Sequence, residues 1–298
     1  MNALIDGLPA LKEEYPFESH FCHLEYGNGQ SAKLHYLDEG TGPVILMLHG
    51  NPTWSFYFRQ CVHYFKARGF RCIVPDHIGC GLSDKPQDYT YTLEQRIQDI
   101  QQLLKHLEIQ SFNLIVHDWG GAIGMGVATR SPESVEKIAI LNSAAYLSRW
   151  MPWRIAFLRT KIIGAFLMRA FNLFAWPAVF MSVRKPLDKK IQKGFLFPYQ
   201  SWKDRIAVAR FVEDIPMSPS HPSYNCLEKI EQELPNLSKK NIGLFWGGRD
   251  FCFNKKFFQR WIEIFPNATQ KMFSDAGHYV LEDAKEEVLD GVSALFTQ

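Results

Sequence analysis

The 298-residue sequence lacks the features that mark several large classes of protein. Its six cysteines are scattered, with no C-x-x-C pair and no histidine cluster at ligand spacing. They indicate reduced thiols rather than a metal site or a disulfide framework. The formal net charge is only +2, and no basic stripe alternates with aromatic residues, which argues against nucleic acid as a partner. The N-terminal residues lack the charged start and long apolar run of a secretory signal peptide. We therefore expect a cytoplasmic protein.

Long uninterrupted apolar runs are also missing. The most hydrophobic part of the chain lies within 146–234, where Arg154, Arg159, Lys161 and Arg169 interrupt the apolar residues and argue against a transmembrane helix. Three interpretations remain: a helical cap that lines a pocket, an interfacial membrane helix, or a docking face for a partner protein. We favour the cap and keep partner docking as an additional role.

The sequence does contain a regular alternation of strand-like and helix-like segments. A helix is expected at 92–107, where Thr92-x-x-Gln95 forms a capping-box pattern. The alternation predicts an α/β fold with a mostly parallel central sheet flanked by helices. We assign 1–145 and 235–298 to this core and 146–234 to an inserted helical cap. Strands are expected at 17–26, 31–38 (joined by a turn at 27–29), 43–48, 69–75, 112 to the turn at Asp118, 135–141, 241–246 and 269–273.

Asp118 occupies the position of a catalytic nucleophile. It follows a short apolar strand and precedes Trp119-Gly120-Gly121, which is the strand, sharp turn and helix of a nucleophile elbow. Serine is the usual residue there, whereas a carboxylate can attack an electrophilic carbon and form a covalent ester. The alternative is that Asp118 merely caps the following helix.

Two further residues complete a triad in chain order. Asp250 stands at the end of a later strand, and His278 lies in the loop after the last strand. Asp250 would orient the imidazole and stabilise its cationic form, while His278 would act as general base or as an electrostatic partner. Taken singly, Asp250 could cap the next helix and His278 could be one of many partly buried histidines.

Two side chains are candidates for binding developing negative charge. Asn51 lies in the loop after strand 43–48, and the indole of Trp119 directly follows the nucleophile. Trp119 could instead be a core aromatic residue. His49 is expected to support the loop, and the glycine-rich segment 76–86 lacks the Lys-Ser/Thr ending of a phosphate loop and is expected to form a structural turn.

These segments resemble the haloalkane-dehalogenase branch of the α/β-hydrolases along essentially the whole chain. The resemblance is carried by residues 49–54, 76–83 and 117–121, Asp250 and 277–278. Within that branch the chain is most similar to the β-lactone decarboxylases of bacterial long-chain olefin biosynthesis. The supporting segments are 14–17, 151–154, 198–202, 211–216, 218–224, 249–252 and 276–283.

The resemblance implies an α/β-hydrolase fold and a lyase that converts a long-chain cis-β-lactone to a cis-alkene and carbon dioxide. Asp118 would attack either the ring carbon or the carbonyl, and the sequence does not choose between them. Asn51 and Trp119 would hold the released anion, while His278 and Asp250 would set the electrostatics of collapse. No metal or cofactor is required, and other olefin-pathway enzymes are implied as partners.

Three other functions stay open at this stage. A haloalkane dehalogenase would use the same residues on a carbon–halogen bond, with His278 activating water. An epoxide hydrolase would need a pair of cap tyrosines, which cannot be assigned among Tyr146, Tyr199 and Tyr224. A non-catalytic interaction protein is disfavoured by the intact triad.

Overall fold

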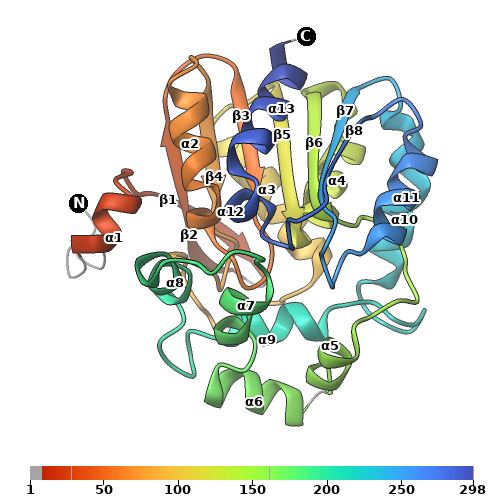
Figure 1. Cartoon of the computed structure of the whole chain (residues 1–298). Coiled ribbons are helices and arrows are strands. Elements are labelled where there is room, and N and C mark those ends of the chain that lie inside the picture. The colour runs from red at the N-terminus through yellow and green to blue at the C-terminus, as the bar shows by residue number, and fades with distance from the viewer. Residues whose placement is uncertain (1–8, 28, 161, 298) are drawn as a thin grey trace.

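An eight-stranded sheet forms the centre of the protein. The computed structural model describes residues 9–27, 29–160 and 162–297 (Figure 1). The strand order is β1-β2-β4-β3-β5-β6-β7-β8. β2 pairs antiparallel with β1 and with β4, and all the other neighbours are parallel. The strands are β1 (His20–Tyr26), β2 (Gln30–Glu39), β3 (Val44–Leu48), β4 (Arg71–Pro75), β5 (Phe112–Asp118), β6 (Val135–Ser143), β7 (Asn241–Gly247) and β8 (Thr269–Phe273).

The sequence predicted this architecture, and the mostly parallel central sheet flanked by helices is confirmed. The first expected strand, 17–26, begins three residues late, because Phe17 leaves the sheet to pack its ring 5.1 Å from Tyr15. The central residue of the predicted turn at 27–29, Asn28, lies outside the described residues.

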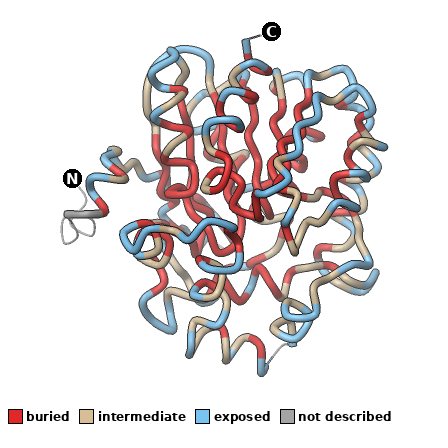
Figure 2. The backbone as a smooth tube through the Cα atoms, viewed as in Figure 1, coloured by how far each residue is buried: buried red, intermediate tan, exposed pale blue. Residues whose placement is uncertain are grey.

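Strand residues alternate between two hydrophobic cores, which explains their continuous apolar runs. One face is formed by Leu46, Leu48, Leu114 and Val116, and the other by Ile45, Met47 and Ile115. Helices α3 (Leu93–His106), α4 (Trp119–Arg130), α10 (Tyr224–Glu233) and α11 (Lys255–Ile264) cover the first face, and α2 (Arg59–Lys66) and α13 (Lys285–Thr297) cover the second (Figure 1). Figure 2 shows the buried residues concentrated in these central strands. Burial on both faces is typical of parallel strands.

The one helix whose bounds the sequence predicted is present. The expected helix at 92–107 is α3, and the Thr92 hydroxyl caps it by accepting a hydrogen bond from the Gln95 N–H at 3.4 Å. Gln95 donates its side-chain amide to Asp99 instead, so only half of the predicted capping box forms. The helices of the core are α1 (Pro9–Glu14), α2 (Arg59–Lys66), α3 (Leu93–His106), α4 (Trp119–Arg130), α11 (Lys255–Ile264), α12 (Val280–Asp283) and α13 (Lys285–Thr297).

The segment predicted as a cap crosses the carboxyl edge of the sheet, at the lower end of Figure 1. Its last helix, α10, packs against α3 and α4 of the core, so the cap is anchored on that side. No single helix in the described ranges is long and apolar enough to cross a membrane. In the same ranges, one bent pair of helices, α6 and α7, reaches that length and composition together, with a bend of 78° between them. The helices are α5 (Trp153–Leu158), α6 (Ile163–Phe171), α7 (Ala175–Met181), α8 (Lys189–Leu196), α9 (Ile206–Glu213) and α10 (Tyr224–Glu233).

Candidate active site

Asp118 stands on a strained turn between β5 and α4. Its φ of 53° and ψ of −126° are unusual for a residue other than glycine, and such strain is concentrated at functional sites. The side chain makes no capping hydrogen bond to α4, so the helix-cap interpretation does not describe this structure. Close packing holds the turn: a Cβ on Gly120 would lie 1.9 Å from the Leu48 carbonyl oxygen, and one on Gly50 would lie 2.0 Å from Asp118 Oδ1.

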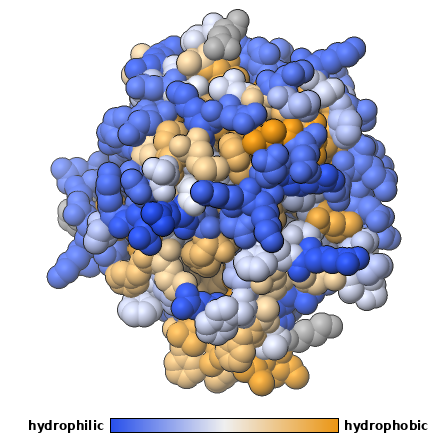
Figure 3. Space-filling model, turned by 45° about the vertical axis from the view of Figure 1, so that its right-hand side comes forward, coloured by the Kyte–Doolittle hydropathy of each residue, from blue (hydrophilic) through white to orange (hydrophobic). Residues whose placement is uncertain are grey.

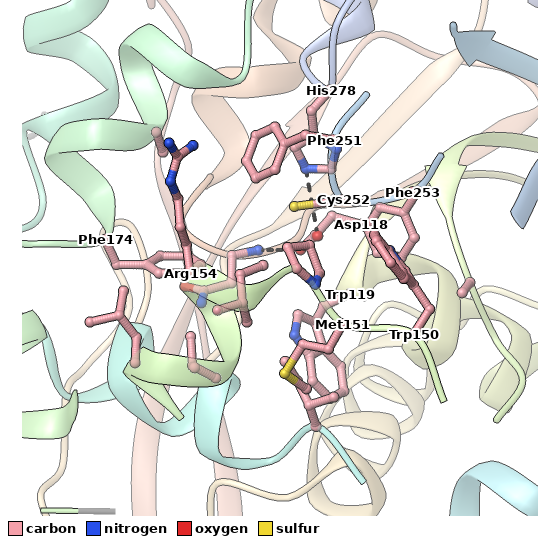
Figure 4. Close-up of a pocket in the computed structure, with 18 of the residues that line it drawn as sticks. Asp118, Trp119, Trp150, Met151, Arg154, Phe174, Phe251, Cys252, Phe253 and His278 are labelled. Atoms are coloured by element: carbon pink, nitrogen blue, oxygen red, sulfur yellow. Dashed lines mark hydrogen bonds and ion pairs between the residues drawn. The ribbon is translucent and has the colours of Figure 1, made fainter. Parts of the chain in front are cut away.

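The structure brings the three predicted triad residues together, and Figure 4 shows Asp118 and His278 facing each other. His278 Nε2 lies 3.6 Å from Asp118 Oδ2, and His278 Nδ1 donates to Asp250 Oδ2 at 2.8 Å. They come from distant parts of the chain: the end of β5, the loop after β7 and the loop after β8. All three are buried. The imidazole thus lies between two carboxylates, one at each ring nitrogen, which is the geometry that the predicted triad requires.

Asp250 is held in place on both oxygens. Its Oδ1 accepts from the backbone N–H of Cys252 at 2.6 Å, and its Oδ2 also accepts from Asn142 Nδ2 at 2.9 Å. Asn142 ties itself to β7 by accepting the Gly247 N–H at 2.8 Å. The next helix, α11, is capped by Asn254, so Asp250 is not its cap. The carboxylate is therefore directed at His278.

Burial and charge act in opposite directions on the two reacting groups. Burial raises the pKa of Asp118, and the nearby His278 and the Asn51 N–H offset only part of that rise. Burial alone would lower the pKa of His278, but the carboxylates of Asp250 and Asp118 outweigh it and the net pKa is raised. The raised pKa of His278 favours an imidazolium beside the two carboxylates.

Asn51 contacts the nucleophile through its backbone rather than its side chain. The Asn51 N–H donates to Asp118 Oδ1 at 2.7 Å. Its side-chain amide donates to the carbonyl of Val208 in α9 at 3.1 Å, while Oδ1 is buried without a hydrogen-bond partner. This departs from the predicted arrangement, in which the side-chain N–H faces the substrate, because α9 of the cap offers a carbonyl at that place. Trp119 lies at the cavity wall, with its ring 5.4 Å from Phe211.

A cavity of about 420 Å³ opens in front of Asp118, between the carboxyl edge of the sheet and the cap. Its lining includes Asn51, Asp118, Trp119 and His278, and most of the other lining residues are apolar. Figure 4 shows Asp118, Trp119 and His278 among them. A mostly apolar cavity of this size with a few convergent polar groups suits a hydrophobic small molecule. Within the described residues, no group of three or more His, Cys, Asp and Glu side chains is placed to hold a metal ion.

The loops around the site have the structural roles predicted for them. His49 donates Nδ1–H to the Gly50 carbonyl at 2.7 Å and accepts the His77 N–H at 3.1 Å. In the glycine-rich segment, Asp76 is fully buried and accepts the backbone N–H groups of Ser55 and Leu82, at 2.6 and 2.8 Å. These residues fix the loop that carries Asn51.

Three supporting residues were missed from the sequence. His117 donates Nε2–H to the backbone carbonyl of His278 at 2.9 Å, and the two rings are 4.5 Å apart. Asn142 holds Asp250, and the Cys252 side chain lines the cavity. Asn142 follows a predicted buried strand, and a polar residue at such a carboxyl end was a usable signal. Nothing local to His117 or Cys252 indicated their partners.

Known proteins that are similar to this chain include a decarboxylase and haloalkane dehalogenases. The family model described as the α/β-hydrolase fold matches residues 43–285. A protein named cis-3-alkyl-4-alkyloxetan-2-one decarboxylase, from Shewanella oneidensis, is 43% identical over 95% of this chain and 89% of its own length. Haloalkane dehalogenase 2 from Mycobacterium tuberculosis is 29% identical over 95% of this chain and 96% of its own length.

A solved structure has the same fold. The haloalkane dehalogenase of Bradyrhizobium elkani superposes with a TM-score of 0.83, at 22% sequence identity, over 93% of this chain and 97% of that chain. Identity at that level speaks for the fold alone. Among the curated relatives named above, the similarity to the decarboxylase, 43% against 29%, is clearly the greater.

Proposed function

This chain belongs to the α/β-hydrolase family, and we propose that it is a lyase that decarboxylates a long-chain cis-β-lactone to a cis-alkene. The observation that carries the proposal is the placement of Asp118: its carboxylate faces an imidazole and opens into a largely apolar cavity. The name of the 43% identical relative supplies the substrate class, an oxetan-2-one with an alkyl group on each of two ring carbons.

The first step forms an ester and opens the ring. Asp118 attacks the ring carbon that bears the ring oxygen, from the side opposite to that oxygen. The carbon–oxygen bond breaks, and its electron pair leaves on the new carboxylate. The product is an alkyl ester of Asp118 with a free carboxylate on the neighbouring carbon. No proton is transferred.

The second step releases both products. The bond between the neighbouring carbon and the carboxylate breaks, its electrons form the carbon–carbon double bond, and the ester bond to Asp118 breaks at the same time. Carbon dioxide, the alkene and the free Asp118 carboxylate result. Because ring opening inverted the attacked carbon, the two departing groups stand anti to each other while the alkyl groups lie on one side. The step therefore yields the cis-alkene.

Attack at the carbonyl is the less economical route. Both oxygens of the released carbon dioxide are already bonded to the lactone carbonyl carbon, so the ring oxygen must separate from the alkyl carbon. Attack at the alkyl carbon breaks that bond directly. Attack at the carbonyl would break the bond between the carbonyl carbon and the ring oxygen, and would leave an alkoxide on the alkyl carbon. That oxygen would still have to leave the alkyl carbon before the alkene could form. We therefore favour the alkyl ester.

The surrounding groups stabilise the charge that moves. The raised pKa of His278, which the Asp250 and Asp118 carboxylates impose against the effect of burial, keeps a cation beside the forming carboxylate. The Trp119 indole and the Asn51 amide are the candidate donors to that carboxylate. Asn51 would have to use its second side-chain N–H, since the first is bonded to Val208. The ester must also be kept from water, which the apolar cavity wall favours.

The runner-up is a haloalkane dehalogenase. It would form the same Asp118 ester from a haloalkane and then hydrolyse it with water activated by His278. The 29% identical relative keeps this function under consideration. An epoxide hydrolase has less support, because of the three candidate tyrosines only Tyr146 lines the cavity, and its hydroxyl donates to the Phe257 carbonyl at 2.9 Å.

One experiment separates these functions. Purified protein is incubated with a dialkyl cis-β-lactone and, separately, with a bromoalkane, and alkene and bromide are measured. We expect alkene without bromide. Bromide alone would assign the chain to the dehalogenases, and the absence of both products would contradict both functions. Asp118→Ala should abolish alkene formation without unfolding the protein, whereas Asp275→Ala, at an exposed aspartate away from the cavity, should leave it unchanged. Assembly with the enzymes that supply the lactone stays a prediction.

A further inference from the structure

Exposed apolar side chains gather on one end of the molecule. Of the fourteen large hydrophobic residues that stand exposed in the described part of the chain, twelve lie on or beside the cap helices α5, α6 and α7. We call these twelve the cap surface. Figure 3 shows hydrophobic side chains gathered at the lower end of the molecule, where Figure 1 places α6. Its members are Trp150, Trp153, Phe157, Ile162, Ile163, Phe166, Phe171, Leu173, Trp176, Phe180, Met181 and Trp202.

The exposure is too great for the surface to belong to the protein core. The side chains of Trp153 and Ile162 are 74% and 84% exposed. Helix α5 buries none of its residues, and α6 buries only Gly164 and Met168. A contiguous apolar patch of this kind marks an interaction surface.

The charge of the same segment has one sign. Between residues 146 and 187 the sequence has seven lysines and arginines and no aspartate or glutamate, whereas the whole chain is nearly balanced at 33 basic to 31 acidic residues. Arg149 and Arg154 are exposed, and within the described residues neither makes an ion pair or hydrogen bond. The Arg154 guanidinium instead lies 5.2 Å from the Trp153 ring. Exposed tryptophan beside unpaired arginine is typical of segments that lie in the headgroup region of a bilayer.

The cavity opens through this surface. Trp150, Trp153, Phe157, Leu173 and Met181 are exposed and also line the cavity in front of Asp118. A molecule that enters the cavity therefore passes between the same side chains that the cap surface presents.

We propose that the cap surface docks onto an anionic lipid bilayer, with its apolar side chains in the headgroup and acyl boundary and its arginines on anionic headgroups. The three short helices would then lie in the interface, and no segment needs to cross the membrane. The cavity would open into lipid, so that an alkyl substrate could pass directly from the bilayer to Asp118. This last point rests on the proposed function, whereas docking does not.

A second copy of the chain fits the surface less well. A symmetric dimer through the cap would place the unpaired Arg149 and Arg154 of each copy near those of the other, with no acidic residue from 146–187 to compensate. It would also close the cavity mouth. Anionic lipid satisfies the arginines and leaves the mouth open to apolar molecules.

The test is co-sedimentation of the full-length protein with vesicles of phosphatidylglycerol or of phosphatidylcholine, without substrate. We expect binding to phosphatidylglycerol that weakens with salt, and much weaker binding to phosphatidylcholine. The double variant Ile162→Glu/Phe171→Glu should lower binding by about tenfold or more, since it places charges in the apolar boundary. Arg149→Ala should lower it by about fivefold. None of these three residues lines the cavity.

Matched controls use the exposed apolar and basic residues away from the cap. Phe21→Glu/Met272→Glu carries the same charge change, and Lys239→Ala removes one exposed cation. Both should bind vesicles like the wild type, and circular dichroism should find all variants folded. Absence of phosphatidylglycerol binding by the wild type, or equal losses in the controls, would overturn the proposal. So would a wild-type dimer that the double variant converts to a monomer, because a second copy would then cover the surface.

Substrate delivery has a separate readout. The Ile162→Glu/Phe171→Glu variant should turn over a lactone embedded in vesicles more slowly than the wild type, yet match it on a short-chain lactone dissolved in water. Equal rates on both substrates would refute delivery. A wild type that binds vesicles but converts neither lactone would instead refute the proposed function and leave docking intact.

Discussion

Replacing Asp250 by asparagine distinguishes charge stabilisation from proton transfer at His278. The wild-type carboxylate is buried and accepts hydrogen bonds from His278 Nδ1, the Cys252 N–H and Asn142 Nδ2, at 2.8, 2.6 and 2.9 Å. Asparagine keeps the shape but removes the negative charge and one of the two acceptor oxygens. The imidazole then loses the partner that fixes its tautomer.

The size of the effect follows from the forces on the imidazole. Burial lowers the pKa of His278, and the carboxylates of Asp250 and Asp118 raise it above its ordinary value. In Asp250→Asn only Asp118 still opposes burial, so the pKa must fall. A hydrogen bond to a charged group contributes about 1.5–3 kcal/mol. Its loss therefore removes stabilisation of the cationic ring that corresponds to a factor of about 10 to 150 in rate.

The two candidate reactions respond to this change differently. In the proposed decarboxylation His278 transfers no proton, so alkene formation should fall by no more than the lost charge stabilisation, about 10- to 150-fold. Hydrolysis of an ester needs His278 as a base in the correct tautomer, and the same exchange of acid for amide in a serine triad costs about 10⁴-fold. The size of the loss of activity in Asp250→Asn therefore distinguishes charge stabilisation by His278 from proton transfer.

The assay is single-turnover alkene formation at neutral pH, measured by gas chromatography, with Asp275→Asn as the control at an exposed position. Thermal unfolding of each variant is recorded alongside, because the new amide is buried. A loss of alkene formation of about 10⁴-fold in folded Asp250→Asn would show that His278 moves a proton and refute the proposed steps. Unchanged activity would show that Asp250 does not set the charge of His278.

Further predictions concern pH, packing and buried charge. Alkene formation needs ionised Asp118 and protonated His278; because burial raises the first pKa and the two carboxylates raise the second against burial, the rate profile should be a bell with both limbs displaced upward. A profile that instead rises through neutrality would indicate a neutral histidine base. Gly50→Ala should displace Asp118, because the new Cβ would lie 2.0 Å from Asp118 Oδ1. The kcat for alkene formation should fall steeply, and the free energy of unfolding measured in urea should fall by about 1–3 kcal/mol. Asp214→Ala leaves Arg96 buried without its 3.2 Å partner and should cost about 3–5 kcal/mol of unfolding free energy in urea; a cost below about 1 kcal/mol would mean that water reaches the arginine.

The sequence predicted the fold and the triad because both depend on local patterns. Strands buried on both faces have continuous apolar runs, and Asp118 and Asp250 stand at the carboxyl ends of two such strands, β5 and β7. His278 follows β8, an exposed edge strand that was recognised by its place in the strand–helix alternation. The resemblance to the haloalkane-dehalogenase branch and to the decarboxylases is confirmed by the relatives that match the chain. A pattern read along the chain therefore located Asp118, Asp250 and His278, though their catalytic roles remain proposals.

The parts that were missed depend on packing between distant segments. The side-chain amide of Asn51 donates to the carbonyl of Val208, which lies 157 positions later in the chain, because α9 packs against the loop that carries Asn51. His117 supports His278 across 161 positions, and nothing in its own neighbourhood predicted that contact. Hydrogen bonds of this kind become visible only when the sheet and cap are assembled.

The proposed docking and the proposed chemistry address one physical problem. An Asp118 ester can either lose carbon dioxide to give the alkene or be hydrolysed by water, and the same three residues could support both reactions. The cavity must therefore admit long apolar chains while excluding water, yet its mouth is lined by exposed side chains such as Trp153 and Phe157. In solution that mouth faces water; on a bilayer it faces hydrocarbon, where water is scarce and the substrate is concentrated. If docking keeps the site dry, vesicles should raise the share of lactone that leaves as alkene rather than as hydroxy acid. The Ile162→Glu/Phe171→Glu variant should not show that increase. If the wild type gave the same proportion of alkene with and without vesicles, docking of the cap surface would have no effect on the fate of the ester.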